Sequence, residues 1–262
     1  MLLLVVAVYG SAFMESFRDW RNSPQDAQGL VIVPFAALVA WVRRQSVIAT
    51  PPGSKLPGLI LAGAACTLHV IGQLAAGLYV SQLSFIVFSA GVIWTFLGIS
   101  RLRALTLPLL LMAIAIPLPS SLYASLSLPL QLLASKMACG IADLVGIAVY
   151  REGYMIHLAS MSVGVWQACS GINSLSALVA GAVLLGFLLC RRLMTRILVC
   201  FAAVPVAVVA NVTRVTGTAL LSDWNPAYAM GFYHVFSSWF VFSVGATGLY
   251  IATISLRKFL EK

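Results

Sequence analysis

Long runs of apolar residues dominate the chain and are separated by short polar or charged segments. The runs roughly cover residues 1–14, 29–42, 57–76, 79–99, 104–118, 126–149, 167–190, 197–221 and 235–256. About 20 apolar residues in helical conformation are enough to cross the hydrocarbon core of a bilayer. The pattern therefore predicts an all-α integral membrane protein, organised as a single polytopic domain over residues 1–262.

The composition supports a membrane location. Of the 262 residues, 61% are apolar and only 9% are charged, and the mean hydropathy is +1.00. Soluble domains are about 45–50% apolar and about 25% charged. One water-soluble core of this size has no room for so much apolar surface, and the remainder would aggregate. A soluble globular enzyme is therefore excluded.

Positive charge is spread between the apolar runs and is not gathered in one patch. The net charge is +9, from 16 Lys and Arg against 7 Asp and Glu. Four clusters hold most of the cations: Arg43, Arg44 and Lys55; Arg101 and Arg103; Arg191, Arg192 and Arg196; and Arg257, Lys258 and Lys262. Such clusters mark the cytoplasmic ends of membrane helices. We therefore expect no nucleic-acid partner and place all four clusters in the cytoplasm.

One apolar run does not fit a membrane crossing. The chain must cross an even number of times between Arg103 and Arg191, yet three runs lie there. The run at 126–149 carries polar residues on one helical stripe and apolar residues on the opposite one. We expect an amphipathic helix at the outer interface, with a re-entrant hairpin as the alternative. About eight spans remain, with both termini cytoplasmic.

Three chemically distinctive residues fall at the outer ends of the helices predicted within 167–256. Cys169 precedes the sixth span, His234 begins the eighth, and Arg214 lies 18 residues beyond Arg196 in the seventh. At 1.5 Å per residue, Arg214 is about 27 Å up its span. An Arg within a span is costly and usually functional. The alternatives are a structural Cys, a His that anchors the interface and an Arg that snorkels to the outer headgroups.

A thiol, a guanidinium and an imidazole on one membrane face can together catalyse acyl transfer. A helix N-terminus and a nearby cation both favour the thiolate, which would make Cys169 nucleophilic. His234 can exchange protons with the leaving and incoming groups. Arg214 can stabilise the thiolate or the tetrahedral oxyanion. Cys169 and His234 lack carboxylate or further His partners at a compatible depth, so we expect no metal and no other cofactor.

Several segments around these residues form a recognisable set. The main segments are Ala168-Cys169-Ser170-Gly171 with Ser174-Leu175, Asn211-x-x-Arg214, and His234 before the final apolar run. Others are Trp20 and Gly29, Pro117-Leu118-Pro119, Leu130-Gln131, Gly146-Ile147 and Gly153. Together they resemble the signature of the exosortase/archaeosortase family over nearly the whole chain. Two positions depart from it: Gln28 stands where relatives often have His, and Asn173 where relatives often have a basic residue.

The resemblance implies a multi-pass cysteine transpeptidase with Cys169, Arg214 and His234 as its catalytic residues. Supporting or substrate-binding roles would fall to Asn211, Asn173, Ser170, Gly171 and Tyr233. Its partners would be membrane lipids and exported, membrane-anchored proteins with a PEP-CTERM-like tail: a short motif such as Pro-Glu-Pro, a transmembrane helix and a basic cluster. The enzyme would lie in the cell (inner or cytoplasmic) membrane with its site facing the periplasm or exterior, and would sort these proteins to the surface or the extracellular matrix.

Two other classes of membrane protein compete with this interpretation. A transporter would line a pathway with Arg214 and His234, and it requires polar residues through the inner half of the spans. A non-catalytic scaffold has no use for Cys169. Elsewhere, His69 and Gln73 in the third span either join helices by hydrogen bonds or line a cavity. The helix at 126–149 and the loop at 150–165 are together the candidates for the rim that reads the substrate motif.

Overall fold

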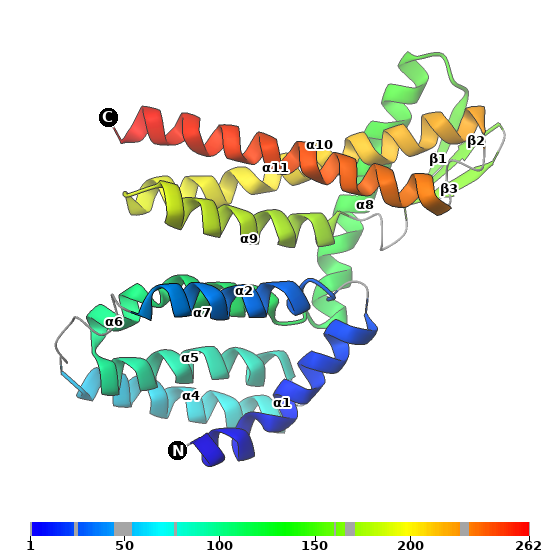
Figure 1. Ribbon diagram of the computed structural model, residues 1–262. Coiled ribbons are helices and arrows are strands. Elements are labelled where there is room, and N and C mark those ends of the chain that lie inside the picture. The colour runs from blue at the N-terminus through cyan, green and yellow to red at the C-terminus, as the bar shows by residue number, and fades with distance from the viewer. Residues whose placement is uncertain are drawn as a thin grey trace. The chain divides into compact units, whose positions relative to one another are not determined.

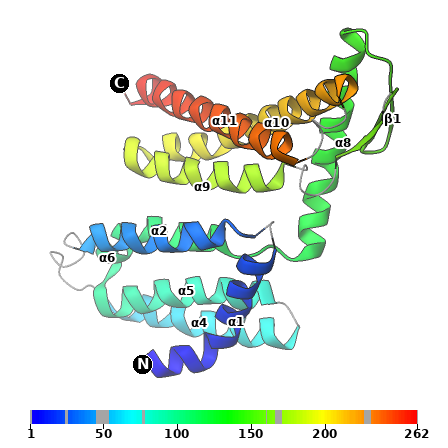
Figure 2. The same cartoon turned by 45° about the vertical axis from the view of Figure 1, so that its right-hand side comes forward.

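The chain divides into two units that are described separately. The computed structural model describes residues 2–23, 26–44, 54–75, 78–159, 161–165, 171–225 and 231–261. Internal contacts separate Met1–Pro119 from Ser120–Lys262 (Figures 1 and 2). Most described residues are helical, as the apolar runs predict. The expectation of a single polytopic domain stays a prediction.

The first unit is built from helices with small residues at their contacts. Its described helices are α1 (Leu2–Asn22), α2 (Gly29–Val42), α4 (Leu56–Leu74), α5 (Leu78–Leu97), α6 (Ile99–Ala104) and α7 (Thr106–Ala115). The α4 and α5 helices lie side by side (Figure 2). A Cβ atom at Gly58 would lie 2.5 Å from the backbone nitrogen of Thr95, and one at Gly91 would lie 2.6 Å from that of Ala62. The two backbones therefore touch directly, as is typical of membrane helix pairs.

Trp20 joins three segments of the first unit. Its Nε1 donates a hydrogen bond to the carbonyl oxygen of Ala115 at the end of α7, at 2.9 Å. Its ring also covers the first residue of α2, Gly29, and leaves no room there for a Cβ atom. Trp20 and Gly29, which are nine residues apart in the sequence, thus form one contact.

His69 and Gln73 take part in hydrogen bonds between α4 and α5. His69 is buried, and its Nδ1 lies 2.9 Å from Ser81 Oγ. Gln73 Nε2 donates to the same hydroxyl at 3.2 Å. The ring of Tyr9 packs against His69, with ring centroids 4.4 Å apart. Helix–helix hydrogen bonding, one of the two roles expected for these side chains, is confirmed.

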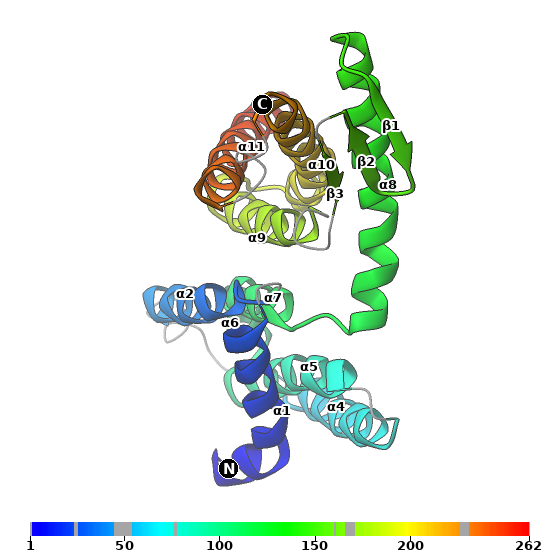
Figure 3. The same cartoon turned by 90° about the vertical axis from the view of Figure 1, so that its right-hand side faces the viewer.

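The second unit is a three-helix bundle flanked by a long helix and a small sheet. Its described elements are α8 (Ser120–Leu144), β1 (Val149–Glu152), β2 (Met155–Leu158), β3 (Ser162–Gly164), α9 (Ile172–Leu189), α10 (Leu193–Trp224) and α11 (Gly231–Leu260). Figure 3 looks along α9, α10 and α11, which surround a common core, with α8 and the sheet beside α10. At the start of α10, the backbone N–H groups of Arg191 and Arg192 both donate to Glu261 Oε1 at 2.9 Å.

The α8 helix turns its polar stripe inward. It begins six residues before the amphipathic helix expected at 126–149 and ends five residues earlier. Gln131 and Ser135 on the polar stripe are buried against the protein, whereas Met137 and Leu144 on the apolar stripe are exposed. An apolar face left outside and a polar face turned inward suit a helix that contacts lipid. Gly146, in the left-handed region with φ of +85°, ends the helix: the next amide, of Ile147, donates back to Ala142.

Three short antiparallel strands follow α8, in the order β1-β2-β3. The sequence predicts only a loop at 150–165, so the sheet is an addition to the predicted all-α fold. Ile156 is fully buried and Val165 nearly so, and both belong to a core shared with α8 and α10. Ser135 of α8 donates to the carbonyl of Gly153 in the β1–β2 turn at 3.1 Å. The sheet is therefore anchored firmly to the second unit.

Five described helices are long and apolar enough to cross a membrane. A sixth crossing is possible if α7 and α8 form one bent span. The expected count of about eight is not confirmed. The α2 and α7 helices have only 14 and 10 residues, and the last eight residues of α1 include Glu15, Arg18, Asp19 and Arg21. The chain is nevertheless a multi-pass helical membrane protein by length and composition.

Candidate active site

The structure places the predicted site residues unequally. Cys169 and Ser170 lie outside the described residues. Tyr233 and His234 fall in the first turn of α11, where only the course of the backbone is described. The remaining candidates, from α9 and α10, are described with their side chains.

Gly171 starts α9 in a conformation that requires glycine. Its φ is +83°, in the left-handed region that residues with a Cβ atom avoid. A Cβ atom there would lie 2.7 Å from Asn211 Cγ. The backbone two residues after Cys169 is therefore packed directly against the side-chain amide of Asn211 in α10.

Arg214 is buried and held by Asn211. Only 9% of Arg214 is exposed, and 6% of Asn211. Arg214 Nη2 donates a hydrogen bond to Asn211 Oδ1 at 2.8 Å. Helical side chains lean toward the N-terminus of their helix, so the guanidinium turns back along α10 toward Asn211 and away from the helix end. This burial argues against an Arg that snorkels freely to the headgroups. Gly171, Asn211 and Arg214 thus form a continuous contact chain.

Asn173 is held by a residue of α8 that was not among the predicted site residues. Tyr123 of α8 donates to Asn173 Oδ1 at 3.3 Å. Tyr123 begins a stripe of buried polar residues at every fourth position of α8, continued by Ser127, Gln131 and Ser135. The spacing of this stripe is visible in the sequence and was the signal that could have identified Tyr123.

Packing between α10 and α11 fixes the relative level of Arg214 and His234. A Cβ atom at Gly245 of α11 would lie 3.4 Å from the Cβ of Ala210 in α10. From this contact, Arg214 lies four residues and His234 eleven residues toward the same end of the bundle. At 1.5 Å per residue, these are about 6 Å and about 16 Å. Both residues are thus on one side of the bundle, with their backbone positions at levels about 10 Å apart.

The described part of the chain offers no metal site, since no three His, Cys, Asp or Glu residues within it lie close enough to share an ion. Among the described residues near α9 and α10, the groups suited to act on a substrate are the buried cation of Arg214 and the polar side chains around it.

Fold and site together define a multi-pass helical membrane protein with a buried, hydrogen-bonded arginine beside the start of α9. Residues 20–251 match the profile of the transmembrane exosortase family, so the chain belongs to this family. Its members are transmembrane cysteine transpeptidases that act on proteins with C-terminal sorting signals. No curated protein and no solved structure is significantly similar to the chain.

Proposed function

We propose that this protein is a membrane-embedded thiol transpeptidase that cleaves PEP-CTERM-like tails from exported proteins and joins those proteins to an acceptor. In this proposal, the nucleophile is Cys169, Arg214 stabilises negative charge and His234 transfers protons. Family membership supports the reaction class.

The single observation that supports the residue assignment best is the contact chain from Gly171 through Asn211 to Arg214. Burying a charged guanidinium in a membrane helix is unfavourable, and such residues are functional by default. Asn211 links this cation to the backbone two residues from Cys169, because its side chain accepts a hydrogen bond from Arg214 and packs against Gly171. Fixed donors at that place are suited to stabilise a developing oxyanion, because they need no rearrangement during the reaction.

The proposed reaction has two steps. The Cys169 thiolate attacks a peptide carbonyl of the tail and forms a tetrahedral oxyanion beside Arg214. When this intermediate collapses, the C–N bond breaks, the leaving amine takes a proton from His234, and a thioester remains on Cys169. The acceptor nucleophile then loses its proton to His234, attacks the thioester and releases the Cys169 thiolate.

We further propose eight membrane crossings, with both termini in the cytoplasm and the site at the outer face of the cell membrane. The short helices α2 and α7 and the charged α1 coincide with three of the apolar runs, which supports their crossing in a bundle. A substrate tethered by its own membrane helix would meet the site at high effective concentration.

The transporter alternative gains little from the structure. The buried positions in the first half of α10 are Thr195, Val199, Ala203 and Ala207, so one hydroxyl is the only side-chain polar group among them. A polar pathway through the inner half of α10 would require more.

Processing of a tagged substrate tests the proposal. The substrate is an exported, epitope-tagged protein that ends in Pro-Glu-Pro, a transmembrane helix and a basic cluster. Co-expression with Cys169→Ala should abolish the shorter, cleaved form on a gel. The matched Cys200→Ala variant should retain it, because Cys200 lies in the first half of α10, away from Asn211 and Arg214 in the second half. Added hydroxylamine should release the product as a C-terminal hydroxamate, detectable by mass spectrometry. Normal processing by a membrane-inserted Cys169→Ala protein would remove Cys169 as the nucleophile.

A further inference from the structure

The outer edge of β3 carries backbone groups that the sheet does not use. Leu158 N donates to Met161 O at 2.8 Å and Val165 N donates to Tyr154 O at 3.1 Å. In an antiparallel ladder, these bonds alternate with positions whose N–H and C=O groups point away from the partner strand. In β3 those positions are Ser162 and Gly164, which face His157 and Met155 in the register. Within the described residues, nothing on the far side of β3 pairs with them as a strand.

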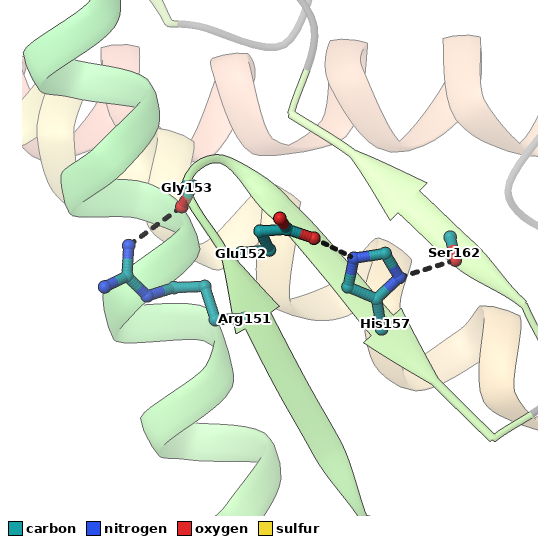
Figure 4. A network of polar contacts seen from close by, with 5 residues as sticks. All are labelled: Arg151, Glu152, Gly153, His157 and Ser162. Atoms are coloured by element: carbon teal, nitrogen blue, oxygen red, sulfur yellow. Dashed lines mark hydrogen bonds and ion pairs between the residues drawn. The ribbon is translucent and has the colours of Figure 1, made fainter.

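This edge is held rigidly by its neighbours. Val163 and Val165 alternate with the two outward-pointing residues and pack into the core that the sheet shares with α8 and α10. Ser162 is exposed, and its Oγ lies 2.8 Å from His157 Nδ1, with the Glu152 carboxylate 3.7 Å from Nε2 of the same ring (Figure 4). The strand therefore presents its free edge without the ordering cost that a flexible loop would carry on binding.

The edge also leads directly to the proposed nucleophile. Cys169 is only five residues beyond Gly164 in the chain. At about 3.3 Å per extended residue, Gly164 is at most about 17 Å from Cys169, and a strand paired with Gly164 lies about 5 Å further away. About seven extended residues of the same peptide therefore cover the largest possible distance, about 22 Å, and bring one of its bonds to the thiol.

We propose that β3 is the docking strand for the substrate: the extended segment that precedes the substrate's membrane helix pairs with Ser162 and Gly164 as a fourth strand. This inference rests on the proposed function. Ser162 and Gly164 each present one N–H donor and one C=O acceptor at alternate positions, which matches the backbone of an extended peptide. A lipid chain has no such alternating groups. Main-chain pairing would hold many different exported proteins, and side-chain pockets would select the motif.

Proline substitutions test the backbone contacts. Ser162→Pro and Gly164→Pro each remove one outward N–H, at positions where an edge strand tolerates proline. Each should raise KM for the tagged substrate about two- to tenfold, the value of one backbone hydrogen bond, with kcat unchanged. Ser162→Ala retains the N–H and should behave as the wild type. The matched control is Val149→Pro, which also removes an N–H that points away from β2, but on the opposite edge strand, β1. This variant should keep the wild-type KM.

Two readouts separate this inference from the proposed function. The rate at which N-ethylmaleimide alkylates Cys169 should be unchanged in the proline variants, which shows that the thiol itself is intact. Wild-type KM in both proline variants, while Cys169→Ala remains inactive, would overturn the docking strand and leave the transpeptidase proposal standing.

Disulfide crosslinking tests docking without catalysis. Ser162→Cys is combined with Cys169→Ala, and single cysteines are scanned along the substrate before its membrane helix. Strand pairing predicts crosslinks that alternate with a period of two residues, and Val149→Cys should give none. Crosslinks without this period, no crosslinks, or crosslinks between two copies of the enzyme would each overturn the proposal.

Discussion

Replacing Gly171 with alanine should destabilise the protein and disturb the proposed site. The left-handed backbone at this position costs a residue with a Cβ atom about 1–2 kcal/mol. The new methyl group would lie 2.7 Å from Asn211 Cγ, and overpacking of this kind costs about 1–3 kcal/mol. The sum, about 2–5 kcal/mol, is a large part of a typical stability of about 5–15 kcal/mol. Because Asn211 is displaced first, the Arg214 guanidinium that it holds should move as well.

The matched control lies in the same helix. Gly181 of α9 has open space at its Cβ position, so Gly181→Ala should leave the melting temperature unchanged or raise it. Thermal unfolding in detergent should show a lower melting temperature for Gly171→Ala alone. Processing, normalised to folded protein, should fall at least tenfold, because a displaced oxyanion donor commonly costs more than that. Equal stability and equal processing of the two variants would refute the packing argument.

Three further predictions concern single side chains. Asn211→Ala removes the acceptor for a charged donor, a loss of about 1.5–3 kcal/mol, and should reduce processing about tenfold, whereas Thr213→Ala on the exposed side of α10 should not. Burial, with Asp19 nearby, raises the pKa of Asp26 to about 6. The folded protein then keeps a proton that the unfolded chain releases, so the melting temperature should fall as the pH rises from about 4 to about 6, and Asp26→Asn should abolish this fall. The backbone N–H groups of Arg192 and Arg191 hold the pKa of Glu261 below its ordinary value of 4.5. Glu261→Gln should therefore melt at a lower temperature than the wild type at pH 7, and the difference should shrink as the pH falls below about 4.5.

The sequence located most helices because apolar runs are a strong signal. The expected run at 29–42 coincides with α2, and 79–99 differs from α5 by one or two residues at each end. The α10 and α11 helices each begin four residues before their runs and end three and four residues after them. Intrahelical hydrogen bonds continue past the apolar residues at both ends, so these two runs underestimate helix length. The strands were missed because each has only three or four residues, although Ile156, His157 and Leu158 alternate in burial as a half-buried strand requires.

The internal contacts of the site depend on tertiary packing. Gly171 and Asn211 are 40 residues apart in the chain, and no local pattern brings them together. The Asn211–Arg214 hydrogen bond is different, because residues three apart on a helix are neighbours. The sequence could therefore predict that pair, whereas the fit of Gly171 against it required the register between α9 and α10.

The contact between α4 and α5 has a consequence for how this sequence can diverge. In the first half of α4 the residues that face α5 are small, with Gly58 and Ala65 buried, while Leu59 and Ile60 point outward and are more than half exposed. Lipid tails accept almost any apolar side chain, so the large residues are free to interchange among Leu, Ile, Val and Phe. A methyl group at Gly58 or Gly91 would instead collide with the neighbouring backbone. In diverging lineages, the bulky positions of this helix pair should therefore vary while the smallest ones stay fixed, the reverse of the pattern on a water-exposed helix.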